Sequence, residues 1–245
     1  MRSLIRAAVL STLGGAMVAL FVEGARAADG FGQRLEQVLN GGNSAELAAL
    51  IAGDQSTVLE RRYTRFTEEF PQARWSVRSA DSLKDGRPTF EVTVNGVGEA
   101  DGLRYRLEAS QRLALNIQGG RILDQQLLEE QSLLRSGDKP LPVTLEIPDA
   151  VLTGSRYDVD VIFEQPLGPS IVAGGLIPLT PQEVANQTRP NLRLEPMGGG
   201  GLFKTVQAPQ TPGSQFWAAM LVHPDGVVTV TKRVRVVGSK QELDQ

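Results

Sequence analysis

The stretch that decides the fold of the first half of the chain is LRYRLEASQRLALNI, residues 103–117. Apolar or aromatic side chains occupy its odd positions, apart from Gln111, and charged or polar ones fill most of its even positions. A repeat of two residues is the period of a strand with one buried face. The length of the stretch predicts one long, bent strand, and the turn signal QGGR at 118–121 predicts that it folds back as a hairpin.

Shorter signals surround this hairpin. Residues 74–86, RWSVRSADSLKDG, predict a strand that runs into an Asp85-Gly86 turn, and the alternation in TFEVTV at 89–94 predicts a second strand. The stretch ILDQQLLEEQSLL at 122–134 predicts the returning strand of the hairpin. Together these signals predict an antiparallel sheet built from neighbouring strands.

Three helices are expected before the strands. Apolar residues recur at helical spacing over 31–39, 47–51 and 59–70. Asn43 followed by Glu46 forms a capping-box pattern, which predicts that the second helix begins there. Pro71 has no backbone N–H and disfavours helical geometry at Phe70, so the third helix is expected to end at this point.

The order of these signals resembles the NTF2-like superfamily, in particular its SnoaL-like branch. The resemblance rests on helices followed by FPQARWSV at 70–77 and a closing hairpin containing IQGGRILDQQ at 117–126, and it covers roughly residues 31–132. It implies an α+β fold over residues 29–137: three helices packed in a curved antiparallel sheet that forms a cone with a pocket inside.

Enzymes of that superfamily place Asp, His or Tyr inside the cone. The resemblance therefore makes a set of inward polar or aromatic side chains the candidate ligand pocket: Tyr63, Trp75, Tyr105, Gln111 and Asp124. The alternative is that the cone is filled by its own side chains, with Tyr hydroxyls hydrogen-bonded at the rim. This half has no His and no acid that clearly points inward, so we assign no catalytic residue and expect no cofactor.

The second half, residues 138–238, predicts an all-β immunoglobulin-like sandwich, followed by a tail at 239–245. The stretch SGDKPLP at 136–142 is a turn-rich domain boundary. About seven short strand-like segments with Gly and Pro turns between them suggest two packed sheets. The segments are VTLEI (143–147), YDVDVIFE (157–164), SIVAGGLIPL (170–179), LRLEP (192–196), FKTVQAP (203–209), SQFWAAMLV (214–222) and VVTVTKRVRVV (227–237).

Three motifs in this half suggest chemistry that the residues do not support. GGGGLFKT at 198–205 approaches a phosphate-binding loop, but Phe203 replaces the second Gly and no helix can follow. His223 precedes a Pro-Asp-Gly turn and is expected as an exposed hairpin residue, not in a catalytic triad. Arg233 and Arg235 share a strand face with Thr229 and Thr231, which predicts a solvated face or, alternatively, a partner surface.

The first 27 residues predict an export signal. Arg2 and Arg6 precede an apolar run, and Ala25-Arg26-Ala27 is a small-x-small cleavage pattern; an uncleaved membrane anchor is the alternative. Loss of residues 1–27 removes three arginines and one glutamate and lowers the formal net charge from −3 to −5. That charge argues against nucleic acid and anionic membranes as partners. Zero Cys and a single His exclude disulfides and Cys- or His-rich metal sites.

The sequence thus predicts an exported, non-catalytic binding or assembly protein, with the periplasm as first choice of compartment and the thylakoid lumen or the cell exterior as alternatives. A homodimer or another protein is the expected partner. The alternative function is a small apolar-ligand binder, or an isomerase or hydrolase, that uses the cone. The candidate partner surface consists of arginines on two predicted strands: Arg104, Arg106, Arg112, Arg233 and Arg235.

Overall fold

The computed structural model describes residues 25–53, 55–100, 102–137, 141–164, 172–186, 190–198 and 200–243. These residues form two compact units, one of residues 25–98 and 108–128 and one of residues 99–107 and 129–243. The predicted export signal, residues 1–27, falls almost entirely outside the described part. Among the described helices, none combines the length and the apolar character that crossing a bilayer requires.

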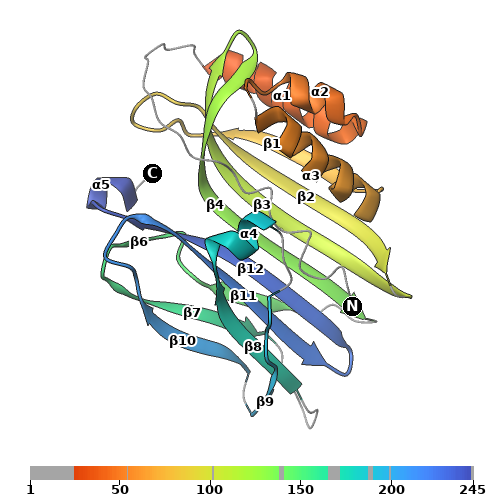
Figure 1. The fold of residues 1–245 in the computed structure, drawn as a ribbon, viewed down its shortest axis with the longest axis vertical. Coiled ribbons are helices and arrows are strands. Elements are labelled where there is room, and N and C mark those ends of the chain that lie inside the picture. Colours follow the sequence, from red (N-terminus) through yellow and green to blue (C-terminus); the bar gives the residue numbers. More distant parts are fainter. Residues whose placement is uncertain are drawn as a thin grey trace. The chain divides into compact units, whose positions relative to one another are not determined.

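The first unit opens with three helices, α1 (Ala25–Gly41), α2 (Ser44–Ala49) and α3 (Gln55–Glu69), which lie together beside the first strands in Figure 1. The predicted N-cap at Asn43 is confirmed, and Glu46 contacts the Asn43 side chain, not its backbone N–H. The Asn43 side chain accepts hydrogen bonds from the backbone N–H groups of Ala45 and Glu46, and its amide donates to Glu46 Oε1 over 3.0 Å. The two bonds to Asn43 Oδ1 satisfy backbone N–H groups that the first turn of a helix leaves unpaired.

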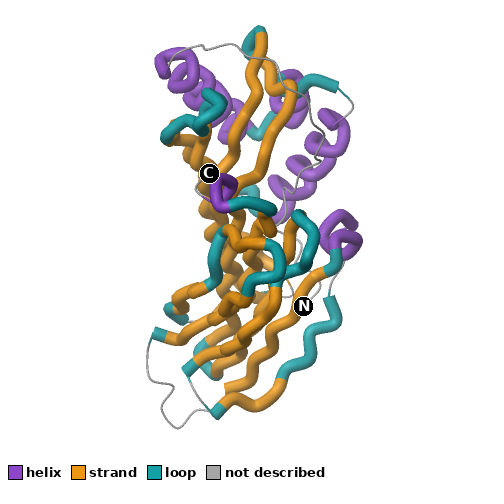
Figure 2. Tube along the Cα trace, turned by 90° about the vertical axis from the view of Figure 1, so that its left-hand side faces the viewer, coloured by secondary structure: helices purple, strands orange, loops and turns teal. Residues whose placement is uncertain are grey.

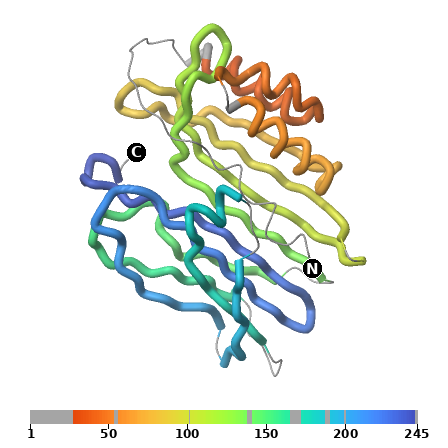
Figure 3. Tube along the Cα trace, viewed as in Figure 1, coloured from red at the N-terminus to blue at the C-terminus, as the bar shows by residue number. Residues whose placement is uncertain are grey.

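Four strands follow the helices in the chain: β1 (Arg74–Ala80), β2 (Thr89–Ala100), β3 (Leu103–Gln118) and β4 (Arg121–Gly137). Figure 3 traces them from yellow to green. The predicted long strand and its hairpin are confirmed as β3 and β4. Gly119 and Gly120 join them with φ angles of 59° and 72°, as a tight two-residue turn between twisted strands requires.

The second unit is a β-sandwich. One sheet has the strand order β4-β12-β11-β8-β9, with β6 parallel to β12, and the other has the order β10-β7-β5. Apolar side chains from both sheets form one core, to which Val159, Val161, Trp217, Val228 and Val230 belong. The remaining elements of this unit are β5 (Val143–Glu146), β6 (Ala150–Leu152), β7 (Arg156–Phe163), β8 (Val172–Leu179), α4 (Pro181–Asn186), β9 (Glu195–Met197), β10 (Gly201–Gln207), β11 (Gly213–His223), β12 (Gly226–Val237) and α5 (Lys240–Leu243).

The prediction of an NTF2-like, α+β cone is wrong. The described chain is mainly antiparallel sheet, as the strands in Figure 2 show, and its five helices are short. Strands β1 to β4 do not close into a cone of their own. Instead β4 continues the hydrogen-bonded order into β12, with Leu133 opposite Val230. Local signals placed the helices and the hairpin correctly, but strand pairing between distant segments has no local signature.

Candidate functional site

Tyr63, the first predicted pocket residue, is a core residue of the first unit. Its side chain on α3 is fully buried, and its hydroxyl donates to the Leu39 carbonyl at the end of α1 over 2.5 Å. Burial raises the pKa of this phenol, against a smaller opposite effect of the Gly42 backbone. The hydroxyl is therefore used to join two helices.

Trp75 is also part of the packing. It is buried on β1, and its ring centroid lies 5.1 Å from that of Phe66, which in turn stacks near Phe70. The side chain of Asn40 binds both the N–H and the carbonyl of Trp75, at 3.0 and 2.9 Å. Tyr63 and Trp75 thus both contact the end of α1. These contacts agree with the alternative that the interior is filled by its own side chains.

The other three candidate pocket residues, Tyr105, Gln111 and Asp124, lie on strands. Tyr105 on β3 is buried, and its hydroxyl has no hydrogen-bond partner among the described residues. Gln111 on β3 and Asp124 on β4 are half-buried. The contacts of Tyr63 and Trp75 go to α1 and α3, and a pocket shared by all five side chains stays a prediction.

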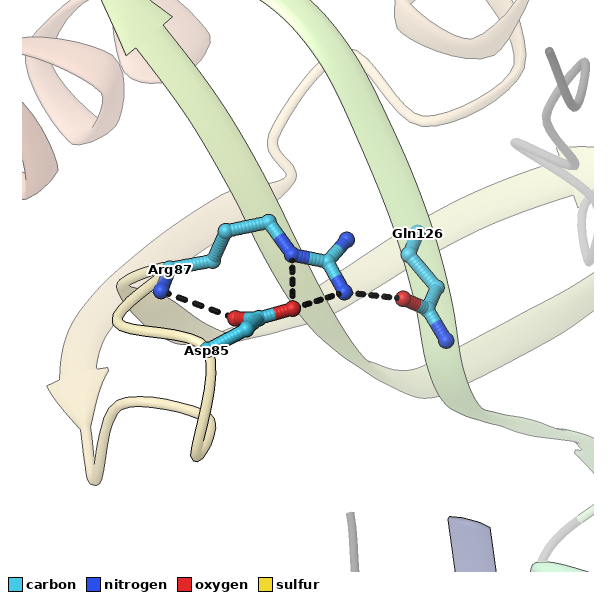
Figure 4. Close-up of polar contacts among 3 residues, drawn as sticks. All are labelled: Asp85, Arg87 and Gln126. Atoms are coloured by element: carbon cyan, nitrogen blue, oxygen red, sulfur yellow. Dashed lines mark hydrogen bonds and ion pairs between the residues drawn. The ribbon is translucent and has the colours of Figure 1, made fainter. Parts of the chain in front are cut away.

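A polar cluster that the sequence did not reveal lies beside the Asp85-Gly86 turn (Figure 4). Arg87 donates to Asp85 Oδ2 over 2.8 Å and to Gln126 Oε1 on β4 over 2.7 Å. The hydrogen bond from Arg87 lowers the pKa of the Asp85 carboxyl, and partial burial opposes it. Leu83 of the same loop packs on Ala114 and Leu128, so the cluster fastens a loop to the sheet.

The predicted partner arginines of β3 are placed differently from one another. Arg104 is exposed, as a partner surface requires. Arg106 is half-buried and donates to the Gly137 carbonyl over 3.3 Å, and Arg112 is half-buried as well. Arg104 is thus the most accessible of the three, and a partner surface on β3 stays a prediction.

The prediction of a solvated face on β12 is wrong. Arg235 and Thr231 are only 6% exposed, although they lie on the face of β12 opposite the core residues Val230 and Val234. Burial lowers the pKa of the Arg233 guanidinium, the nearby Glu130 carboxylate raises it, and Arg235 lowers it. Arg235 donates to the Glu242 carbonyl of α5 over 3.3 Å. These charges are part of the interior and not an open surface.

Two further polar contacts fasten β12 to its surroundings. On the same face, the Ser132 and Thr231 hydroxyls lie 2.7 Å apart and join β4 to β12. On the opposite, core-facing side, the Lys232 ammonium binds Asp149 and lies 3.4 Å from Gln131 Oε1. The Lys232 side chain is 7% exposed and the Asp149 side chain 42% exposed, so the pair lies at the rim of the core.

The two other motifs of the second half have structural roles. His223 is half-buried at the β11–β12 turn, where its Nδ1 accepts a hydrogen bond from the Asp225 backbone over 3.1 Å. Residues 201–207 form strand β10, so the segment that resembles a phosphate loop opens no helix. Among the described residues, no group of His, Asp and Glu side chains could hold a metal ion.

The most exposed large apolar side chain among the described residues of the second unit is Phe203, which is 63% exposed on β10, at the edge of the three-stranded sheet. Register places Phe203 opposite Asp160 on β7, and Asp160 opposite Glu146 on β5. We call the side of this sheet that points away from the core its outer face. That face includes Thr144, Glu146, Arg156, Asp158, Asp160, Glu164, Phe203 and Thr205.

Sequence reasoning did not find this face, although its signal was present. In YDVDVIFE, residues 157–164, Asp158, Asp160 and Glu164 alternate with the buried Tyr157, Val159, Val161 and Phe163. The alternation itself shows that acidic side chains share one face of the strand. Only the pairing with β5 and β10 brings Glu146 and Phe203 to the same face.

Residues 138–237 match a family model described as "Domain of unknown function (DUF8623)". The match covers the sandwich strands β5 to β12. No curated protein matches the chain. The sandwich therefore resembles a domain family whose description carries no activity.

Proposed function

We propose that this chain is a non-catalytic binding protein that engages a protein partner through the outer face of the β10-β7-β5 sheet. The observation that carries the proposal is the exposure of Phe203. Full burial of a Phe side chain contributes about 1.5–3 kcal/mol, and buried aromatic side chains are frequent energetic centres of interfaces. An aromatic ring left in water on a sheet face is therefore a strong anchor for a partner.

The sheet beneath Phe203 is a rigid support. On its inner side, Leu202, Val206, Val159 and Val161 pack into the core of the sandwich. Residues 201–207 pair with β7 along the whole strand, which leaves the ring on a fixed backbone. A fixed anchor loses little conformational entropy when a partner binds, which favours association.

The proposal includes export. The N-terminal sequence with Arg2, Arg6 and an apolar run supports it, and the absence of Cys agrees with a compartment where free thiols would be oxidised. We place the protein in the periplasm, and we regard the sandwich as immunoglobulin-like in its strand arrangement. Interaction through a sheet face is common among sandwich domains of many unrelated functions, so the fold alone supplies no partner.

Site-specific crosslinking tests the proposal. A photo-reactive amino acid at position 203 should capture one discrete protein in the producing cells, and the same amino acid at position 123 should not. Leu123 is the matched control, because it is 45% exposed but belongs to the first unit. The identified protein should then fail to co-purify with the Phe203→Ser chain and still co-purify with Leu123→Ser. Unchanged recovery with Phe203→Ser would refute the proposal.

A second candidate function is the binding of a small, mostly apolar molecule, and it rests on Tyr105. A buried hydroxyl without a partner is uncommon, and a bound water or ligand would satisfy it. Native mass spectrometry of the chain from its own host should then show a bound mass that Tyr105→Phe removes while the melting temperature stays within a few degrees. A spectrum of the wild-type chain without any bound mass would eliminate this candidate.

A further inference from the structure

The outer face of the β10-β7-β5 sheet is acidic. Asp158, Asp160, Glu146 and Glu164 all lie on it, and Arg156 is the one cation that register places among them in the described strands. We propose that the partner docks on this face with a basic, extended polypeptide segment. This inference rests on the proposed function and specifies the chemistry of the partner.

The cross-strand register of the acidic residues lowers the stability of this sheet in the isolated chain. Glu146 stands directly opposite Asp160, and like charges in that relation destabilise a sheet. Asp158 and Asp160 follow one another on the same side of β7, which adds to the repulsion. A lysine or arginine side chain of the partner, placed over these carboxylates, would offset the repulsion and form charge-assisted hydrogen bonds with them.

The carboxylates are already oriented. Asp158 Oδ1 accepts from the Thr205 hydroxyl over 2.6 Å, and Glu164 Oε1 accepts from the Thr144 hydroxyl over 2.8 Å. Asp160 Oδ1 accepts from the Lys204 backbone N–H over 3.3 Å. Each contact holds one carboxylate oxygen, and a carboxylate has further lone pairs for a cationic donor.

The nearest lysine does not neutralise the face. Lys204 alternates with Phe203 along β10, so its side chain leaves the opposite side of the strand. There its ammonium lies 5.6 Å from the centroid of the Trp217 ring, in a cation–π contact. The row from Glu146 through Asp160 therefore ends at an exposed aromatic ring and not at a positive charge.

These features together define the segment that fits. Strands lie about 4.8 Å apart, so the row of Glu146, Asp160 and Phe203 spans roughly 10 Å across the sheet. Positive side chains reach the two carboxylates while an apolar side chain covers Phe203. Nucleic acids and anionic lipid surfaces carry the same sign of charge as this face and are repelled by it.

The test uses three fluorescent twelve-residue peptides that alternate Val with Lys, Ser or Glu. They are titrated against the full chain at 25 mM and 300 mM NaCl. The Lys peptide should bind at least tenfold more tightly than the Ser peptide at low salt and lose most of that advantage at high salt, because salt screens exposed charges. Equal binding of the Lys and Ser peptides would overturn the inference.

Matched variants locate the binding. The first is a triple variant that keeps the shape of each side chain: Glu146→Gln, Asp158→Asn, Asp160→Asn. It should lower the affinity for the Lys peptide about tenfold, because each exposed ion pair contributes a factor of roughly two in affinity. The control variant Glu68→Gln, Glu91→Gln, Glu99→Gln removes three exposed carboxylates elsewhere and should stay within twofold of the wild type. Equal weakening by both triple variants would contradict a specific acidic site.

The crosslinked partner separates this inference from the proposed function. If Phe203→Ser abolishes its recovery and the acidic triple variant does not, the outer face binds a partner but the basic segment is wrong. If the triple variant abolishes recovery and Phe203→Ser does not, the charge inference stands and the anchoring role of Phe203 is wrong.

Discussion

Removal of Asp149 should destabilise the sandwich far more than removal of Lys232, although the two side chains form one ion pair. Lys232 lies on the core-facing side of β12, between Val230 and Val234, and its side chain is 7% exposed. Asp149 lies at the rim, with 42% of its side chain exposed. Each single substitution therefore leaves a different group behind.

In Asp149→Ala the ammonium of Lys232 stays in a nearly dry position, where the Gln131 oxygen at 3.4 Å is its remaining partner among the described residues. Breaking a fully buried pair in this way costs about 3–5 kcal/mol. Because Asp149 is partly solvated, its attraction to Lys232 is screened, and we expect a loss of about 2–3 kcal/mol. In Lys232→Met the stem is retained and Asp149 turns to water, so we expect a loss of about 1 kcal/mol or less.

Urea unfolding of four chains measures this asymmetry: the parent, both single variants and the double variant. The chain has two tryptophans, so a Trp75→Phe parent makes the fluorescence of Trp217 report on the sandwich alone. Trp217 stands opposite Lys232 in the β11–β12 register. The double variant should have about the same free energy of unfolding as Lys232→Met, because without Lys232 the loss of Asp149 leaves no buried ammonium unpaired.

Equal losses of unfolding free energy in the two single variants would refute this reasoning. They would show that the loss comes from the broken ion pair and not from a buried Lys232 ammonium without a partner. An additive double variant would refute it as well, because independent sites show no coupling. Both outcomes are read from the same four unfolding curves, with unchanged slopes as the control for a two-state transition.

Three further predictions concern packing and pH. Tyr63→Phe should lower the free energy of unfolding by about 1–2 kcal/mol in thermal melts, because the Leu39 carbonyl loses its buried donor. Burial raises the pKa of Tyr63 and Tyr157 above the ordinary 10.0, so the unfolded chain ionises first. Stability measured by urea unfolding should be independent of both phenols below pH 10 and fall above it, and replacing both with Phe should flatten this fall. Gly98→Ala should lower the free energy of unfolding by about 1–3 kcal/mol, because a Cβ there would lie 2.5 Å from the Glu69 carbonyl oxygen at the end of α3. An unchanged melting temperature would show that α3 shifts freely.

Local chemistry made much of the secondary structure predictable. Asn43 caps α2 because its side chain reaches the backbone N–H groups of Ala45 and Glu46 within one turn. Gly119-Gly120 forms a turn because only residues that tolerate positive φ fit there. Each of these contacts joins residues a few positions apart. The same holds for the alternation that predicted β3, which depends on the chain's own period.

The candidate site was less predictable, and Tyr63 shows why. Its spacing on α3 correctly predicted that the side chain points inward, but the spacing does not predict which groups the side chain contacts there. Whether the hydroxyl meets a ligand or the Leu39 carbonyl depends on where α1 ends relative to α3. The prediction for Arg235 was wrong for a similar reason: its charge predicted a solvated face, but the residue is 6% exposed and donates to the Glu242 carbonyl of α5.

The sequence by itself determined the helices of the first unit, the β3–β4 hairpin, and a second half made of short strands, because each depends on periodicity, caps and turns within a few residues. Tertiary structure alone decided that β4 pairs with β12 and that Phe203 shares a face with Asp160 and Glu146. Pairing of distant strands depends on how whole surfaces fit, and the backbone hydrogen bonds that hold them are the same for every residue other than proline.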